Sequence, residues 1–137
     1  MKTVTTYLSF DGNCRQAMSF YGECFATDVE LSTYPDASGQ PSSDPAAKIM
    51  HAQVMRGGAP ILMASDTPQS GSLRVGNSVS VAIDCESLEE ADRLFGALSQ
   101  GGEIRMPLTD APWGARFGML TDQFGFQWLI NCALPGK

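Results

Sequence analysis

The chain has 137 residues, 43% of them hydrophobic, and a formal net charge of −6 at pH 7. A chain of this length fits one globular domain, residues 1–137, which can bury enough surface to fold without a metal or a disulfide. The dispersed basic residues argue against a nucleic-acid partner, and no apolar run approaches the ~18 residues of a membrane span. We therefore expect no nucleic-acid partner and no membrane partner.

Two features predict a cytoplasmic protein. Residues 1–6 lead directly into a strand-like alternation, without the long apolar centre of a signal peptide. The cysteines show no C-x-x-C spacing and lie in apolar or small-residue settings, which is typical of buried reduced thiols. They are Cys14, Cys24, Cys85 and Cys132.

The first predicted strand alternates from residue 3 to residue 10, so that its side chains point to two faces. One face holds Val4, Thr6, Leu8 and Phe10, and the other holds Thr3, Thr5, Tyr7 and Ser9. Asn13 is a candidate cap for a helix whose apolar residues recur at helical spacing, at Ala17, Phe20, Tyr21 and Cys24. The helix is expected to cover the apolar face, leaving Tyr7 and Ser9 for a ligand.

Residues 34–45 are too poor in apolar side chains to pack, which predicts a mobile loop that is either a lid or an inert insertion. Residues 50–65 then predict a hairpin with its turn at Gly57-Gly58. His51 and Gln53 share one face of its first strand. Asp66 follows the hairpin, where it either caps a turn or orients a base, and Asp122 presents the same two alternatives.

The second half repeats the order of strand, helix and strands after a connection over residues 66–76. Ser78 and Ser80 alternate with Val79, Val81 and Ile83 in a predicted strand. Ser87 and Glu90 form a capping box for the second helix, which ends at Gly101-Gly102.

Residues 113–128 indicate strand, tight turn and strand. Trp113 and Phe117 share a face if the strand is regular, which predicts either an aromatic wall for a planar ligand or a core or dimer contact. Gly114 and Gly118 permit close approach of another backbone. If Trp128 faces the helix, Gln127 points to the opposite side.

The segments YLSFDGNC, residues 7–14, and WGARFGMLTDQFGFQW, residues 113–128, resemble the vicinal-oxygen-chelate (glyoxalase/bleomycin-resistance/dioxygenase) superfamily, and most closely its PhnB-like branch. The resemblance implies an α+β fold of paired βαβββ modules, residues 1–66 and 77–137. The modules would form an open eight-stranded, U-shaped mixed sheet with the helices outside. The resemblance also implies a homodimer.

Superfamily enzymes hold a divalent metal with His, Gln or Glu. Aligned on this sequence, their ligand positions fall on Thr5, Ser78, Leu129 and either Leu62 or Met63, none of which is a competent ligand. We therefore expect no metal, with a metal held by His51 and carboxylates from elsewhere as the less favoured alternative. We expect no other cofactor either, because there is no Walker loop, no G-x-G-x-x-G after a strand and no glycine-rich segment for the adenosylmethionine that a methyltransferase would need.

The expected function is binding of a small organic molecule in the sheet cavity without a catalytic metal, as in the bleomycin-resistance members. The expected lining combines aromatic, hydroxyl and amide groups. It comprises Tyr7, Ser9, Gln53, Ser78, Ser80, Trp113, Phe117 and Gln127. The alternative is a lyase- or isomerase-type enzyme in which His51 is the general acid/base, since imidazole suits proton transfer near neutral pH. For each of these side chains an ordinary structural position is the other possibility.

Overall fold

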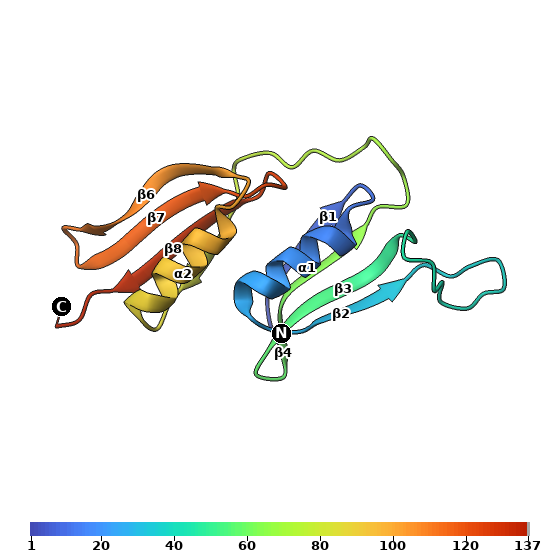
Figure 1. Ribbon diagram of the computed structural model, residues 1–137, viewed down its shortest axis with the longest axis horizontal. Helices are drawn as coiled ribbons and strands as arrows, with labels where there is room; N and C mark the ends of the chain where they lie inside the picture. The colour runs from blue at the N-terminus through green and yellow to red at the C-terminus, as the bar shows by residue number, and fades with distance from the viewer. Residues whose placement is uncertain (137) are drawn as a thin grey trace. The chain divides into compact units, whose positions relative to one another are not determined.

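The computed structural model describes residues 1–136 and divides into two units, Met1–Arg74 and Val75–Lys137. Each unit contains a strand, a helix and three further strands, in that order, as Figure 1 shows. The predicted pair of βαβββ modules in the α+β class is confirmed. The eight strands form two mixed four-stranded sheets, one in each unit.

Unit 1 is built from β1 (Thr6–Phe10), α1 (Cys14–Phe25), β2 (Val29–Thr33), β3 (Ile49–Arg56) and β4 (Ala59–Asp66). Its sheet has the strand order β1-β4-β3-β2, in which β1 runs parallel to β4 and the other neighbours are antiparallel. The crossover through α1 lets β2 run parallel to β1. Because β3 and then β4 each reverse direction, β4 is parallel to β1 and can pair with it.

Helix α1 packs against β2, β3 and β4 and covers one face of the sheet (Figure 1). Leu8 and Phe10 are buried, whereas Tyr7 and Ser9 are exposed, so the predicted alternation of the strand is confirmed from residue 7 to residue 10. The placement of Val4 in this strand is wrong. Val4 precedes β1 and is 87% exposed, because β1 pairs with β4 only from Thr6 onward.

The N-terminus of α1 is capped from a distant strand. Asp66 Oδ1 accepts hydrogen bonds from the backbone amides of Gly12 at 2.9 Å and Cys14 at 3.0 Å. Asp66 Oδ2 accepts from the amide of Ile49 at 2.8 Å. Asn13 stands at the N-cap position but its side chain makes no capping hydrogen bond, so the predicted cap was wrong. The carboxylate instead joins α1, β3 and β4.

The hairpin of unit 1 is confirmed, with Gly57 at φ 60° and Gly58 at φ 79° in its turn. Two successive positive φ angles are accessible to glycine at little cost, and they match the strand twist. The segment 34–45 has its own short-range structure, since Pro35 and Pro41 form a bridge. Asp36 Oδ1 accepts from the Ser38 amide at 2.9 Å, and the Tyr34 hydroxyl donates to the carbonyl of Asp66 at 3.1 Å.

Unit 2 is built from β5 (Ser80–Asp84), α2 (Leu88–Leu98), β6 (Glu103–Ala111), β7 (Ala115–Thr121) and β8 (Gln127–Ala133). Its strand order, β5-β8-β7-β6, repeats that of unit 1, with β5 parallel to β8. Helix α2 packs on β7 and β8. Trp128 and Ile130 are buried, so that Gln127, Leu129 and Asn131 project from the other face of β8.

The capping box of α2 is confirmed. The Ser87 hydroxyl accepts from the Glu90 amide at 3.1 Å, and the Glu90 carboxylate accepts from the Glu86 amide at 3.0 Å. The predicted close approach at Gly118 is also confirmed. A Cβ there would lie 2.7 Å from the Phe95 ring of α2 and 3.0 Å from Cα of Leu108, at an irregular part of β6.

Asp122 caps the turn between β7 and β8. Its Oδ1 accepts from the amides of Phe124 and Phe126, and its Oδ2 accepts from the Trp128 indole at 2.8 Å. The turn-capping alternative is therefore the one observed for Asp122, whereas Asp66 caps helix α1 instead of a turn. The four cysteines are buried and free, as expected. Over residues 1–136, no helix has the length and apolar character needed to cross a membrane.

Candidate functional site

The face of the unit 1 sheet opposite α1 carries His51 and three of the expected ligand-binding residues, Tyr7, Ser9 and Gln53, and we call it the first open face. Alternation and strand pairing place its side chains in two rows. The first row is Tyr7, Met63, Gln53 and Glu30, and the second contains Ser9, Ser65, His51 and Ser32. The residues that alternate with these rows point to the helix side and are buried, among them Leu62, Ala64 and Val54.

A chain of polar contacts joins four of these side chains across the two rows. The Tyr7 hydroxyl lies 3.5 Å from His51 Nδ1, and the two ring centroids are 6.0 Å apart. His51 Nε2 lies 3.4 Å from Gln53 Oε1, and Gln53 Nε2 donates to Glu30 Oε2 at 3.1 Å. His51 and Gln53 are therefore on one face, as their spacing predicts.

The chain of contacts selects one tautomer of His51. Because Glu30 can only accept, the Gln53 amide turns its nitrogen to Glu30 and its oxygen to His51. That oxygen also only accepts, so Nε2 carries the proton. Nδ1 of the neutral ring is then the nitrogen with a lone pair, directed toward the Tyr7 hydroxyl. This arrangement can accept a proton or a hydrogen bond at Nδ1 and offer a donor from Tyr7 beside it.

The face of the unit 2 sheet opposite α2, which we call the second open face, carries a different set of polar contacts. Gln127 Oε1 accepts from the Arg105 guanidinium and from Thr121 Oγ1, the latter at 3.1 Å. Gln127 is 7% exposed, so its amide oxygen is committed to these partners. Ser80 pairs with Gln127 in the register of β5 and β8 and is exposed.

Two expected lining residues of unit 2 lie outside the strands predicted for them. Ser78 lies in an exposed bend before β5, which begins only where pairing with β8 starts at Ser80. Trp113 lies in the turn between β6 and β7 and is 69% exposed. It still meets Phe117, at a centroid distance of 5.9 Å and an angle of 69°, so the predicted aromatic pair exists in edge-on geometry.

Sequence reasoning missed Glu30 and Arg105. Glu30 and Ser32 are two residues apart in β2 and so share a face, and that period of two was a usable signal for the face of Glu30. Arg105 lies in β6, where pairing with β7 shifts register between Ile104 and Met106. Such an irregularity changes which face a side chain occupies, and no feature of the sequence marks it.

Burial makes two of the thiols poor nucleophiles. Burial, with the Asp66 carboxylate adding to it, raises the pKa of Cys14 to about 12. Burial, and then the Glu90 carboxylate, raises the pKa of Cys85 to about 11. On the helix side of unit 2, the hydrogen bond from Arg116 to Asp110, 2.7 Å long, lowers the pKa of the Asp110 carboxyl. None of these groups belongs to either open face.

The superfamily's metal chemistry does not fit the side chains present. Thr5 precedes β1, Ser78 lies outside β5, and Leu129 and Met63 offer no charged or imidazole donor. In the part of the chain that the structure describes, no three His, Cys, Asp or Glu side chains gather as a group that could hold a metal ion.

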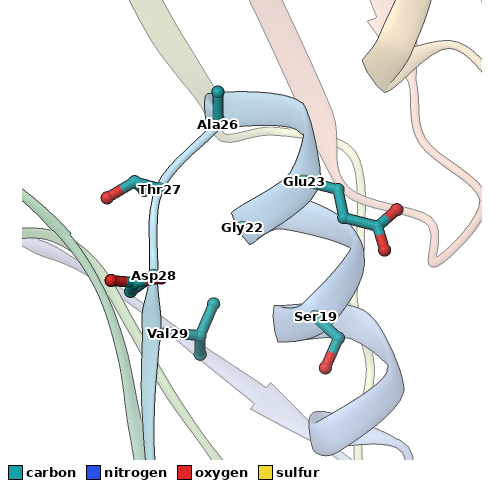
Figure 2. Close-up of a pocket in the computed structure, with 7 residues that line it drawn as sticks. All are labelled: Ser19, Gly22, Glu23, Ala26, Thr27, Asp28 and Val29. Atoms are coloured by element: carbon teal, nitrogen blue, oxygen red, sulfur yellow. The ribbon is translucent and has the colours of Figure 1, made fainter.

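Two hollows also occur in unit 1, and neither is lined by a residue of the contact chain from Tyr7 to Glu30. One, of about 370 Å³, lies where α1 ends and β2 begins (Figure 2). There Val29 points at Gly22, and its Cγ2 occupies the space that a Cβ on residue 22 would need. The other hollow, of about 540 Å³, lies beside the N-terminal turn of α1.

Comparison with known proteins decides the family. The family described as 3-demethylubiquinone-9 3-methyltransferase matches residues 2–131. The chain belongs to this family. Protein YjdN of Escherichia coli K12 is 32% identical over 139 residues, covering 93% of each chain.

Solved structures agree with this assignment. Protein PA1353 from Pseudomonas aeruginosa is 37% identical, with a TM-score of 0.77 over 98% of this chain and 99% of that one. The PhnB protein from Bacillus cereus is 29% identical, also with a TM-score of 0.77, over 96% and 100%. A glyoxalase/bleomycin resistance protein/dioxygenase family enzyme from Burkholderia phytofirmans shares the fold at 16% identity and a TM-score of 0.64. The resemblance to PhnB-like proteins is confirmed, and the chain shares the fold of the glyoxalase/bleomycin-resistance/dioxygenase proteins.

Proposed function

We propose that this chain binds a small organic molecule on the first open face, without a catalytic metal. The observation that carries the proposal is the contact chain from Tyr7 through His51 and Gln53 to Glu30. It places donors and acceptors in a fixed pattern on a sheet surface, where the Tyr7 side chain is 48% exposed. A few directed polar groups beside apolar surface are characteristic of small-molecule sites.

The pattern also restricts the ligand. Met63 lies between Tyr7 and Gln53 in the first row, so an apolar or planar part of the ligand can pack there. Glu30 supplies negative charge at the end of the row, in a chain of net charge −6. These features favour a neutral or cationic organic molecule that donates hydrogen bonds, because opposite charge also steers its approach.

Thermal-shift screening of EDTA-treated protein tests the proposal, with hits titrated by calorimetry. Tyr7→Phe removes one hydroxyl from the face and should raise the dissociation constant about threefold to tenfold, the value of one hydrogen bond. Tyr34→Phe removes the same group from outside the face and should leave binding unchanged. Equal affinity in wild type and Tyr7→Phe, or stabilisation that needs an added metal, would refute the proposal.

The second candidate is a lyase- or isomerase-type enzyme, favoured by the position of His51 Nδ1 beside the Tyr7 hydroxyl on an open face. In this mechanism Nδ1 accepts a proton from a carbon or oxygen of the substrate, and the imidazolium returns it at another atom. His51→Gln keeps a hydrogen-bonding side chain and removes the proton transfer. Turnover of a hit should then fall on the order of 10²–10⁴-fold with little change in affinity. Undiminished turnover would eliminate this role.

We do not propose methyl transfer, although the family's description names it. Adenosylmethionine needs a glycine-rich loop after a strand, and the β1–α1 connection contains the single glycine Gly12. The amides of Gly12 and Cys14, which a bound cofactor would need there, already bind the Asp66 carboxylate.

A homodimer in the cytoplasm is also proposed. Unit 2 exposes large apolar side chains that a second copy could cover, namely Val79, Ile104, Met106 and Trp113. The buried free cysteines suit a reducing compartment. Light scattering that finds only monomer at micromolar concentration would refute the dimer, and recovery of the protein outside the cytoplasmic fraction would refute the location.

A further inference from the structure

The hollow of about 540 Å³ in unit 1 is lined by both polar and apolar residues. It lies between the N-terminal turn of α1, the end of β2 and the segment 41–45. Its lining consists of Arg15, Leu31, Ser32, Thr33, Pro41, Ser42, Ser43 and Pro45. Ser32 pairs with His51 and so points its side chain to the first open face, which leaves three hydroxyls on the hollow's side of β2.

Arg15 is the charged residue of this lining. Within residues 1–136, its Nε is buried and has no hydrogen-bond acceptor. No acidic side chain lines the hollow, although the whole chain carries a net charge of −6. Arg15 places its positive charge in the lining, so the hollow favours a ligand that supplies an anionic oxygen.

Hydrogen bonds fix two of the neighbouring hydroxyls and leave the Ser42 proton available. Ser42 Oγ accepts from the amide of Asp44 at 3.1 Å, so its own proton is free to be donated into the hollow. Thr33 Oγ1 donates to the carbonyl of Ser42 at 2.8 Å, which holds the segment against β2. Arg15 itself lies in the first turn of α1, where the helix dipole adds to its positive potential.

We propose that this hollow binds a phosphoryl group, as free phosphate or as the head of a phosphate monoester. Arg15 pairs with two of its oxygens, and the hydroxyls of Ser42 and Ser43 donate to the third. Leu31, Pro41 and Pro45 provide an apolar wall for an ester substituent. The site is separate from the first open face and stands or falls independently of the function proposed there.

Titration with inorganic phosphate, followed by NMR at constant ionic strength, tests the proposal. The Arg15 Nε–H resonance and the amides of Thr33, Ser42 and Ser43 should shift saturably. Arg15→Gln should raise the dissociation constant on the order of tenfold to a hundredfold, the value of charge-assisted hydrogen bonds. The dissociation constant of Arg15→Lys should lie between those of wild type and Arg15→Gln. Arg74→Gln, which removes the same charge at an exposed position outside the hollow, should bind like wild type.

Phenyl phosphate distinguishes the two sources of the phosphoryl group. Tighter binding than inorganic phosphate assigns the apolar wall to an ester substituent, whereas equal binding assigns the hollow to free phosphate, and either result supports the proposal. The Nε–H resonance of Arg15 is measured in the wild-type protein. The test therefore does not depend on whether a variant folds. An unsaturable shift, a shift confined to other residues, or equal affinity in folded Arg15→Gln would overturn it.

Discussion

The carboxylate of Asp66, the last residue of β4, accepts a hydrogen bond from the backbone amide of Cys14 at 3.0 Å. It thereby caps α1 from a position 52 residues away in sequence. This bond joins the helix of unit 1 to its sheet. Asp66 is 1% exposed, so its hydrogen bonds are made out of contact with solvent. The stability of the unit should therefore depend on this side chain more than on any local cap.

Replacing Asp66 with alanine should destabilise the protein by about 3–5 kcal/mol, because the buried amides of Cys14 and Ile49 and the partly buried amide of Gly12 lose their acceptor, at roughly 1–3 kcal/mol for each buried amide. Asn13→Ala should change the free energy of unfolding by less than about 0.5 kcal/mol, since Asn13 makes no capping bond. Urea unfolding of the two variants measures both values. Equal losses would mean that Asn13 caps the helix.

Gly22→Ala should destabilise the protein by about 1–3 kcal/mol, the usual cost of overpacking. Its new Cβ would meet Val29 at the junction of α1 and β2 (Figure 2). Gly96→Ala in α2 is the matched control, since nothing lies within 4 Å of its Cβ position. There the gain in helix propensity should stabilise the protein by up to about 1 kcal/mol. Thermal unfolding of both variants gives the comparison, and a stabilised Gly22→Ala would contradict the packing.

Cys14 should make the protein less stable at alkaline pH. Its thiol has an ordinary pKa of 9.0 when unfolded, and burial raises this pKa to about 12 in the folded state. Below pH 9 both states keep the proton, so the full contribution is present. As the pH rises from 9 toward 12, only the unfolded state loses its proton, and the free energy of unfolding falls.

The measurement is the slope of the unfolding free energy against pH between 9 and 11. Wild type should fall more steeply than Cys14→Ala, by no more than about 1.4 kcal/mol per pH unit, the limit for one proton. Comparing slopes removes the constant cost of the small cavity in the variant. Parallel slopes would show that the Cys14 thiol ionises alike in the folded and unfolded states.

Sequence patterns predicted what depends on local periodicity and spacing. The alternation of Tyr7 to Phe10, the capping box at Ser87 and Glu90 and the shared face of His51 and Gln53 all follow from such patterns, and the structure contains them. The cap of α1 could not be found in this way, because Asp66 comes from a strand far along the chain. Local signals favoured Asn13, and tertiary contact overrode them.

The strand ends and the irregular strand account for the remaining differences. Ser78 and Trp113 continue the alternation of their neighbours in sequence. A strand begins only where hydrogen bonding to a partner strand begins, however, and that depends on residues far along the chain. Arg105 could not be placed because of the register shifts in β6.

The central claim is that the first open face binds the ligand, and the ring of His51 tests it most directly. His51 is the single histidine of the chain, so its imidazole NMR signals need no further assignment. In EDTA-treated protein, a ligand found by screening should shift these signals saturably, with the same dissociation constant that calorimetry gives. Saturable binding by calorimetry that leaves the His51 ring signals unmoved would contradict the account.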